Sequence, residues 1–430
     1  MRIVHLVPGS GGGFYCENCV RDNALARALL RTGEDVRVVP LYLPPMEDSP
    51  AARSGVPIFF GGINVYLQQK SGLFRKTPRW IDRLFDASPL LRWAARRAGS
   101  VRASGLGETT LSMLKGMEGN QAKELRRLVE WLGSSEPCDV VHLSNALLLG
   151  VGAEIRRRLG VPLVCSLQDE DSWLEAMEEP WRGRCWEALA EAARQADAFT
   201  AVSRTYAGIM GGRLGIPPER LHVVLPGIDP EEFSPPPAPP DPPAVGFLGR
   251  ASESLGLGIL AEAFLGLRES PTFRTLRLHV TGGATEDDRP FLKSLQARFA
   301  DRGAAASVKF YEDFGTAGRR EFLRSLSVLS VPAPSGAAFG LYLLESFASG
   351  VPAVQPLTGA FPEILEATGA GVLYHPNTPE ALAEVLGDLL GDPARRAELG
   401  RRGREAVERR FNLDVLARKM KEVYRKVARP

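Results

Sequence analysis

A repeated unit of apolar strand, glycine-rich turn and helix constrains the fold of this 430-residue chain more than any other feature. Its clearest copy begins with the apolar run 327–331, which predicts a buried strand. A turn rich in proline, serine and glycine follows, and 339–349 then predicts a helix. Gly350 ends that helix, and 351–354 predicts a second short strand. Such a unit is the building block of a parallel sheet covered by helices.

The turn before this helix is suited to an anion. Leu341, Leu344 and Ala348 recur at helical spacing, so one face of the helix is expected to be buried, with Glu345 off that face. Free backbone N–H groups and the helix dipole both face the turn. Glu345 lies about five residues into the helix, roughly 7–8 Å along its axis, and its side chain leans back toward the N-terminus. A diphosphate at the helix mouth, with a ribose beside it, fits that geometry.

The N-terminus carries a second copy of the unit. Residues 2–7 predict a buried strand, 8–13 a glycine-rich loop, 18–31 a helix that Gly33 ends, and 36–41 the next strand. A βαβ unit with a glycine-rich first turn is typical of nucleotide-binding doubly wound sheets. The strict G-x-G-x-x-G fingerprint is ambiguous within a glycine run and lacks an acidic partner at the usual distance, so it is a weak signal for NAD.

Strand–helix alternation in both halves of the chain predicts the domain plan. The proline-rich stretch 231–243 is the clearest linker. The fold class is therefore α/β, with two doubly wound parallel-sheet, Rossmann-like domains facing one another across a cleft. We expect these domains at 1–230, with a helical insertion at about 55–130, and at 244–410. The C-terminal helix, 411–430, is expected to pack back on the first domain.

Charge excludes one class of partner and leaves a second open. The net charge is +2, from 53 basic and 51 acidic residues, which argues against nucleic acid. The segment 70–102 is an exception, because nine basic residues stand there against Asp82 and Asp86, a net of +7. In one interpretation, this segment is a surface that binds anionic lipid or an acidic acceptor. In the other, it is a helical insertion with a solvated basic face. The second interpretation is favoured.

Cysteine usage and hydropathy bear on location. Five cysteines, an odd number in a long chain, do not form a disulfide framework, so a reducing cytoplasm is expected. Peripheral contact with the inner membrane face would follow if 70–102 binds lipid. No stretch approaches the roughly 18 apolar residues of a membrane span. Cys16 and Cys19 form a C-x-x-C pattern before the first helix, for which two ordinary thiols are favoured over a redox pair.

With this plan in place, several motifs resemble those of retaining glycosyltransferases of the GT-B fold, in the GT4-like family. In chain order they are the glycine loop 9–13, Leu-Pro-Gly-Ile-Asp-Pro-Glu-Glu-Phe at 225–233, Gly-Phe-Leu-Gly-Arg at 246–250, Phe-Gly-Leu through Gly-Val-Pro at 339–352, and Gly-Val-Leu-Tyr-His-Pro-Asn-Thr-Pro-Glu-Ala at 371–381. The stretch 339–352 is the strongest match. The resemblance covers nearly the whole chain, and the order and spacing of the motifs together are specific.

The resemblance implies a hexosyltransferase-type enzyme whose C-terminal domain holds a nucleotide-diphosphate sugar and whose N-terminal domain faces the acceptor. Arg250 and Glu345 would be its catalytic residues. Arg250 would neutralise the growing charge on the diphosphate, and Glu345 would accept hydrogen bonds from the ribose. No cofactor and no metal are implied. The further donor-binding residues that it implies are Gly11, Gly12, Gly13, Ser335, Phe339, Gly340 and Leu341.

Four residues at the ends of predicted strands are candidates for the acceptor side: His142, Gln168, Asp169 and Glu170. His142 fits a satisfied core histidine about as well. With Asp171, Asp169 gives the D-x-D pattern of metal-dependent glycosyltransferases of the other major fold. It falls in the wrong half of the chain for that role, so these carboxylates are expected to line the cleft or cap the following helix.

Three positions depart from the family's usual pattern. Leu255 stands where the family commonly has a lysine, Ala337 where it has a glutamate, and Gln168 where it often has a histidine. These changes favour an alternative function, namely a catalytically altered or inactive relative that serves as a nucleotide-binding or partner subunit. The sequence leaves the sugar, the base and the acceptor open.

Overall fold

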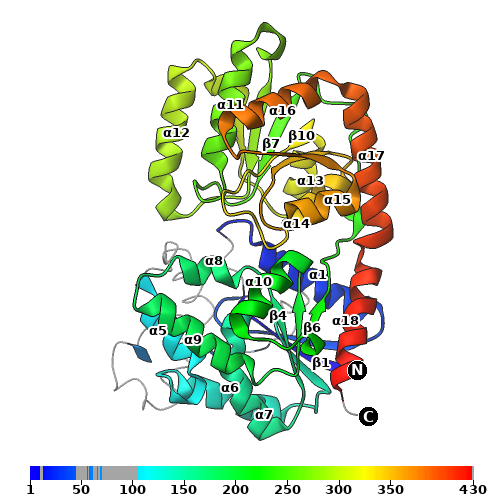
Figure 1. Cartoon of the computed structure of the whole chain (residues 1–430). Helices are drawn as coiled ribbons and strands as arrows, with labels where there is room; N and C mark the ends of the chain where they lie inside the picture. Colours follow the sequence, from blue (N-terminus) through cyan, green and yellow to red (C-terminus); the bar gives the residue numbers. More distant parts are fainter. Residues whose placement is uncertain are drawn as a thin grey trace. The chain divides into compact units, whose positions relative to one another are not determined.

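A computed structural model describes residues 1–9, 13–44, 56, 58–61, 65, 68–69 and 105–428 of the chain. It contains two compact units, each described here by itself (Figure 1). The first unit comprises Met1–Gly11, Asn18–Leu225 and Leu416–Pro430, and the second comprises Gly12–Glu17 and Pro226–Val415. The proline-rich stretch 231–243 therefore groups with the second unit, and so does the short segment 12–17. The basic segment 70–102 lies outside the described residues.

The first unit is built on a six-stranded parallel sheet with the order β2-β1-β3-β4-β5-β6. Its central strands are the most buried: five of the six residues of β1 and all four of β3 are buried. That pattern is expected when helices cover both faces of a parallel sheet. The strands are β1 (Arg2–Val7), β2 (Asp35–Pro40), β3 (Val140–Leu143), β4 (Leu163–Leu167), β5 (Ala198–Ala201) and β6 (Leu221–Val223).

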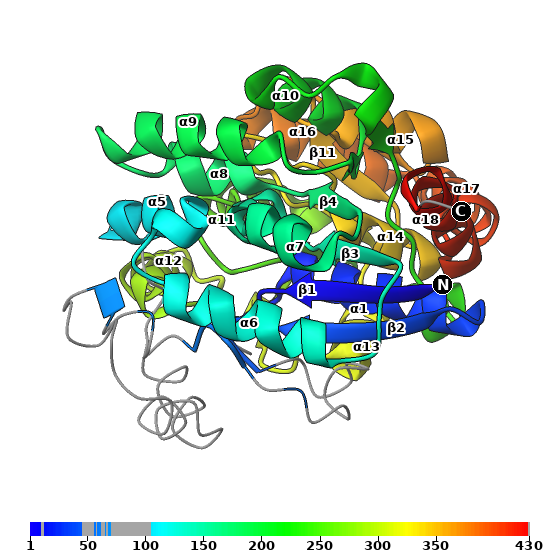
Figure 2. The same ribbon diagram turned by 90° about the horizontal axis from the view of Figure 1, so that it is seen from below.

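Helices cover this sheet, and Figures 1 and 2 show α8 and α5 lying against α9 and α6 lying beside α7. The α-helices with most or all of their residues in this unit are α1 (Glu17–Arg31), α5 (Gly107–Leu114), α6 (Ala122–Ser134), α7 (Gly152–Leu159), α8 (Glu170–Glu175), α9 (Trp181–Ala193), α10 (Arg204–Leu214) and α18 (Leu413–Val427). The helix predicted at 146–159 begins as the 3₁₀ helix η4 (Ala146–Val151) before α7.

The C-terminal helix α18 belongs to the first unit because of its apolar stripe. Leu416, Ala417, Met420, Val423 and Tyr424 are all buried and recur at helical spacing on one face. The side chains between them are charged, and most are exposed. Among the described residues, no helix combines the length and the hydropathy needed to cross a membrane.

The second unit repeats the plan with a six-stranded parallel sheet in the order β12-β11-β10-β7-β8-β9. Its strands are β7 (Ala244–Leu248), β8 (Arg277–Thr281), β9 (Val308–Tyr311), β10 (Val328–Leu329), β11 (Ala353–Pro356) and β12 (Gly371–Tyr374). Its α-helices are α11 (Leu257–Glu269), α12 (Arg289–Asp301), α13 (Thr316–Arg324), α14 (Leu341–Ala348), α15 (Phe361–Thr368), α16 (Pro379–Gly391) and α17 (Pro393–Arg410). The prediction of two doubly wound parallel sheets is confirmed.

The strand order gives each sheet a topological switch point. In the second sheet the chain runs outward from β7 through β8 to β9, then returns to the other side of β7 as β10. Loops after β7 and β10 therefore diverge at the carboxyl edge of the sheet, where ligands of such folds bind. In the first sheet, β1 and β3 form the corresponding switch point.

Candidate active site

Helix α14 (Leu341–Ala348) begins at the switch point of the second sheet, directly after the loop that follows β10. The sequence predicted one buried face, but all eight residues of α14 are buried, because the helix lies between β11 and α17. Gly340 is its N-cap, with a φ of 93° in the left-handed region that favours glycine. Gly340 brings no side chain to cap the first turn.

The predicted anion site at the mouth of α14 holds a carboxylate of the chain itself. Both oxygens of Glu17 accept from the Leu341 amide, each at 3.1 Å. Glu17 belongs to the segment 12–17, which the structure places in the second unit. A negative charge at this end of a helix is favoured by the helix dipole. The position predicted to bind a phosphate is therefore suited to an anion.

Glu345 forms a buried ion pair with Arg319 of α13 (Thr316–Arg324). The Nε and Nη2 atoms of Arg319 donate to the two carboxylate oxygens, both at 2.9 Å, and the side chains are 3% and 1% exposed. This two-pronged geometry gives the strongest carboxylate contact that arginine can make. A carboxylate has about four acceptor positions, so two remain beyond this pair. Glu345 is not a solvated helix carboxylate, and its contact with a ribose stays a proposal.

Tyr15 adds a buried hydroxyl to the same region. Its ring lies over the Arg319 guanidinium, 5.2 Å from the ring centre. Its backbone N–H donates to the Gly282 carbonyl at 2.8 Å. The hydroxyl is buried, and no partner for it is present among the described residues. Burial, with the negative charges of Glu345 and Glu17, raises the pKa of Tyr15 well above its ordinary value. The hydroxyl is therefore a hydrogen-bond donor at neutral pH.

Arg250 stands in the turn after β7, at the same edge of the sheet. Its Nη2 donates to Ser254 Oγ at 3.2 Å, and its Nε lies 3.7 Å from an oxygen of Asp288. The side chain is 33% exposed, so it can still donate to a ligand. The turns after β7 and β8 touch through their backbones: a Cβ on Gly282, which has a φ of 119°, would lie 2.2 Å from the Gly249 carbonyl oxygen. Only glycine allows this approach.

The remaining donor candidates differ in exposure. Gly13 and Ser335 are exposed, whereas Phe339 is buried against the ring of Phe411. Gly11 and Gly12 lie outside the described residues. At the positions that depart from the family pattern, the Leu255 side chain packs beside Gly249, and the Ala337 carbonyl accepts from the Ala360 amide at 3.0 Å. Neither position carries a charge to the site.

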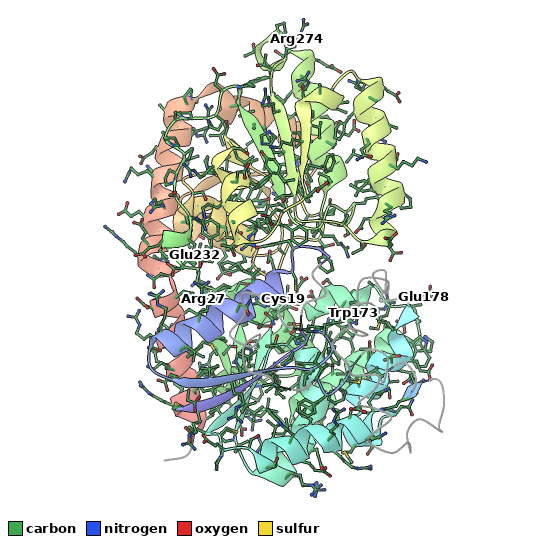
Figure 3. All side chains as sticks on the ribbon, turned by 180° about the vertical axis from the view of Figure 1, so that it is seen from behind. Cys19, Arg27, Trp173, Glu178, Glu232 and Arg274 are labelled. Carbon is green, nitrogen blue, oxygen red and sulfur yellow. The ribbon has the colours of Figure 1, made fainter. Side chains whose placement is uncertain are left out.

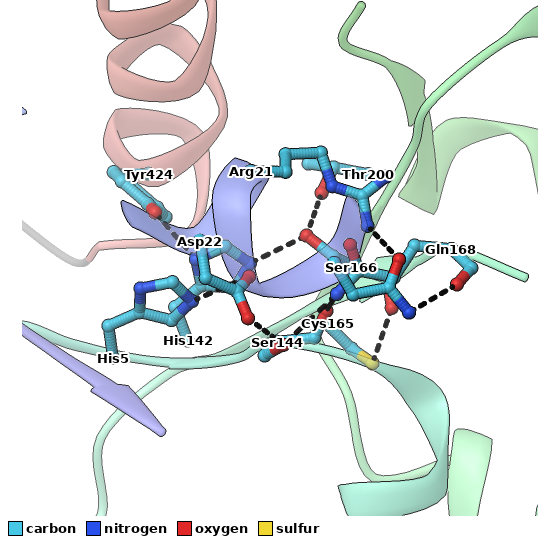
Figure 4. Close-up of polar contacts among 11 residues, drawn as sticks. His5, Arg21, Asp22, His142, Ser144, Cys165, Ser166, Gln168, Thr200 and Tyr424 are labelled. Carbon is cyan, nitrogen blue, oxygen red and sulfur yellow. Dashed lines mark hydrogen bonds and ion pairs between the residues drawn. The ribbon is translucent and has the colours of Figure 1, made fainter. Parts of the chain in front are cut away.

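His142 has the contacts of a satisfied core histidine, and its role on the acceptor side stays a prediction. It is fully buried in β3, its Nδ1 pairs with the Tyr424 hydroxyl at 2.8 Å, and its Nε2 pairs with Ser166 Oγ at 2.9 Å (Figure 4). The ring of His5 stacks on it at 4.7 Å. Burial lowers the pKa of His142 well below its ordinary value, so the ring is neutral. Both of its nitrogens are already engaged within the fold.

Glu170 is also structural. Its Oε1 accepts from the Ala146 amide at 2.8 Å, and its Oε2 accepts from the Gln168 amide at 2.6 Å and the Tyr206 hydroxyl at 2.9 Å. The side chain is buried, and burial raises the pKa of Glu170. The carboxylate therefore organises the loop after β4 rather than facing a ligand. The role of Glu170 as an acceptor-side residue stays a prediction, and these contacts favour the alternative that it caps the following loop and helix.

Gln168 and Asp169 remain candidates at the end of β4 (Leu163–Leu167). The Gln168 side chain is buried, and its Nε2 donates to the carbonyl and hydroxyl oxygens of Ser144. Its Oε1 has no partner among the described residues. Asp169 is exposed and takes a φ of 76°, the only positive φ found at a described non-glycine residue. Such backbone strain gathers at functional sites.

The carboxylate of Asp22, on α1, shares this network (Figure 4). It accepts from Ser144 Oγ at 2.6 Å and lies 3.7 Å from His5 Nε2. Burial raises the pKa of Asp22 to about 6, and the Ser144 bond opposes the shift. Burial, with the charge of Arg21, lowers the pKa of His5 to about 3, so the contact with His5 is not an ion pair at neutral pH. The network is polar, and among the described residues Gln168 Oε1 and both ring nitrogens of His5 have no hydrogen-bond partner in it.

The bonding state of two cysteines differs from the one predicted from the sequence. Cys16 and Cys19 are disulfide-bonded, whereas Cys138, Cys165 and Cys185 are free. The interpretation of Cys16 and Cys19 as two ordinary thiols is therefore wrong in this structure. Cys19 lies in the first turn of α1, as Figure 3 shows. The two cysteines lie on either side of Glu17 in the sequence. Their disulfide closes a ring of four residues that includes the backbone of Glu17. Among the described residues, no three His, Cys, Asp or Glu side chains gather as a metal site.

Comparison with known proteins gives the family. The family described as Glycosyltransferase Family 4 matches residues 112–232, and that described as Glycosyl transferases group 1 matches residues 229–406. The D-inositol 3-phosphate glycosyltransferase of Acidothermus cellulolyticus is 32% identical over 302 residues, which span 67% of each chain. The chain belongs to the GT4-like glycosyltransferases. A relative of the same name in Xylanimonas cellulosilytica is 32% identical over 244 residues, 53% of this chain.

Some of these matches cover only about half of the relative's length. The match to this chain spans 56% of the length of the Xylanimonas relative. This chain is also 31% identical to the Mycobacterium leprae phosphatidyl-myo-inositol mannosyltransferase, over 42% of this chain and 46% of that protein. Solved structures show the GT-B fold. Sucrose-phosphate synthase from Thermosynechococcus elongatus aligns over 99% of both chains at 18% identity and a TM-score of 0.72. The Anabaena protein HepE in complex with UDP-glucose aligns over 99% of this chain and 100% of its own, at 16% identity and a TM-score of 0.69.

Breaking the buried ion pair will destabilise the second unit. Arg319→Met leaves the Glu345 charge buried without its guanidinium, so the free energy of unfolding should fall by about 3–5 kcal/mol. Arg319→Met combined with Glu345→Leu replaces the pair by apolar groups and should recover most of the loss. Denaturant unfolding of the single and double variants measures this, with the exposed Arg274→Met as control. If the double variant is no more stable than Arg319→Met alone, the unpaired Glu345 charge is not the cause of the loss.

The cysteine assignment predicts a thiol count. Protein purified without reductant and then denatured should react with a thiol reagent at three cysteines, and at five after reduction. A count of five before reduction would show that Cys16 and Cys19 are not bonded.

Proposed function

We propose that this chain is a glycosyltransferase that moves a sugar from a nucleotide-diphosphate donor to a polar acceptor, with retention at the anomeric carbon. The observation that carries the proposal is the mouth of α14, where a backbone amide already binds a carboxylate at the switch point of a doubly wound sheet. The names of the relatives and the UDP-glucose complex of HepE support a nucleotide-sugar donor. Retention rests on the family resemblance.

The donor's diphosphate would lie between the mouth of α14 and Arg250. There the Leu341 amide supplies a donor aligned with the helix dipole, and Arg250 supplies a charge that can bond two phosphate oxygens. Departure of the nucleoside diphosphate places negative charge on these oxygens, so fixed donors stabilise the transition state more than the ground state. Glu345, held by Arg319, would use its free lone pairs for the ribose hydroxyls.

The acceptor would bind near the end of β4 in the first unit. Gln168 Oε1 is a buried acceptor without a partner among the described residues, and the exposed Asp169 carboxylate follows it. Such groups suit hydroxyls. Relatives are named for inositol 3-phosphate and phosphatidyl-myo-inositol, so a polyhydroxylated acceptor is the first class to test. The basic segment 70–102 keeps its two interpretations, and location at a membrane surface stays a prediction.

A non-catalytic nucleotide-binding subunit is the second candidate. It is favoured by two side chains that bring no charge to the site, Leu255 and Ala337. The two candidates separate on turnover. A transferase will release nucleoside diphosphate from its sugar donor when a suitable acceptor is added, whereas a binding subunit will hold the nucleotide without release.

The donor-site proposal predicts that Arg250→Gln weakens UDP binding by about 10- to 100-fold, because one charge-assisted hydrogen bond is lost. Isothermal titration calorimetry measures this. Arg274→Gln is the matched control: it removes an exposed arginine three residues before the start of β8, at the opposite edge of the sheet, and should leave binding unchanged (Figure 3). Equal loss in both variants, or no binding of UDP, GDP or ADP to the wild type, contradicts the proposal.

A further inference from the structure

Glu17 occupies the place that the proposed function gives to a phosphate. We propose that Glu17 is an internal competitor of the donor's diphosphate, which holds the mouth of α14 until the donor displaces it. This inference rests on the proposed function. It adds a built-in brake on donor binding, supplied by the loop before α1.

The contact itself is specific. Each carboxylate oxygen of Glu17 lies 3.1 Å from the Leu341 nitrogen, 324 positions along the chain. The Leu341 amide hydrogen is already shared by the two carboxylate oxygens, and their negative charge repels a phosphate at this distance. A diphosphate can therefore bind the mouth of α14 only after Glu17 has left it. Glu17 is only half-buried, so its side chain has access to solvent.

The surroundings hold more donor capacity than Glu17 uses. Tyr15 is only 6% exposed. Its buried hydroxyl has no hydrogen-bond partner among the described residues. It lies near enough to Glu17 and Glu345 for both charges to affect it. Arg250 stands at the same edge of the sheet with a third of its side chain exposed. A buried donor without a partner is costly, and a ligand with several oxygens would satisfy it.

The backbone around Glu17 is restrained, which confines the exchange to the side chain. Phe14 forms a bridge with Gly283, and the Tyr15 amide donates to Gly282, so the residues before Glu17 are fixed to the turn after β8. The Cys16–Cys19 disulfide closes a ring that contains Glu17, so it restrains the backbone of that residue. Rotation of the Glu17 side chain is then the simplest way to clear the mouth of α14.

Substitution of Glu17 should strengthen the binding of phosphates and of nothing else. Glu17→Gln lowers the charge at the site, and Glu17→Asp keeps the charge but shortens the reach to Leu341. Both variants should bind UDP and inorganic pyrophosphate about fivefold more tightly than the wild type, the size of one capping contact. Uridine, which has no phosphate, should bind all three proteins equally.

Titration calorimetry with these three probes tests the proposal, with the protein in one disulfide state throughout. Glu366→Gln, an exposed carboxylate on α15 (Phe361–Thr368), controls for net charge and should match the wild type. Unchanged or weaker UDP and pyrophosphate binding in Glu17→Gln overturns the proposal while the donor site stands. Tighter pyrophosphate binding without binding of any nucleoside diphosphate supports the Glu17 brake and refutes the donor. An equal gain in Glu366→Gln, or in uridine binding, also overturns the brake.

Discussion

A charged carboxylate buried inside an α/β unit is the constraint on which the second unit depends. Glu345 is 1% exposed within a helix whose eight residues are all buried. Leaving such a charge without a partner would cost more than most single contacts supply. Arg319 meets it with two parallel hydrogen bonds, so α13 and α14 are tied at one place, and the register of α14 determines where its first amides point.

The site then follows from backbone geometry more than from side chains. Parallel strands bring their carboxyl ends to one edge, and the strand order separates the loops after β7 and β10 there. Glycine at positions 282 and 340 lets the turns approach one another and lets α14 begin without a side chain over its mouth. An amide at a helix mouth binds an anion whatever its residue type. A phosphate at this helix mouth, as proposed, therefore needs no charge from Leu255 or Ala337.

Much of this could be predicted from the sequence, and the remainder could not, for identifiable reasons. Alternation of apolar runs and glycine turns predicts both sheets, because periodicity and strand–helix order leave few topologies. The same pattern places His142 and Glu170 near strand ends but cannot say which groups satisfy them. Tyr424 and Ser166 engage His142 from 282 and 24 residues away. Composition likewise argued against a disulfide, although two cysteines three positions apart need no framework to bond.

The residues that the sequence did not reveal are Tyr15, Glu17 and Arg319, since each acts through a contact that the linear pattern does not encode. The central claim, that the mouth of α14 binds the donor's diphosphate, is tested most directly by a crystal structure with UDP. We expect a phosphate oxygen within hydrogen-bond distance of the Leu341 nitrogen, with the Glu17 carboxylate moved off it. UDP bound elsewhere, or bound in the second unit with Glu17 still on Leu341, would contradict it.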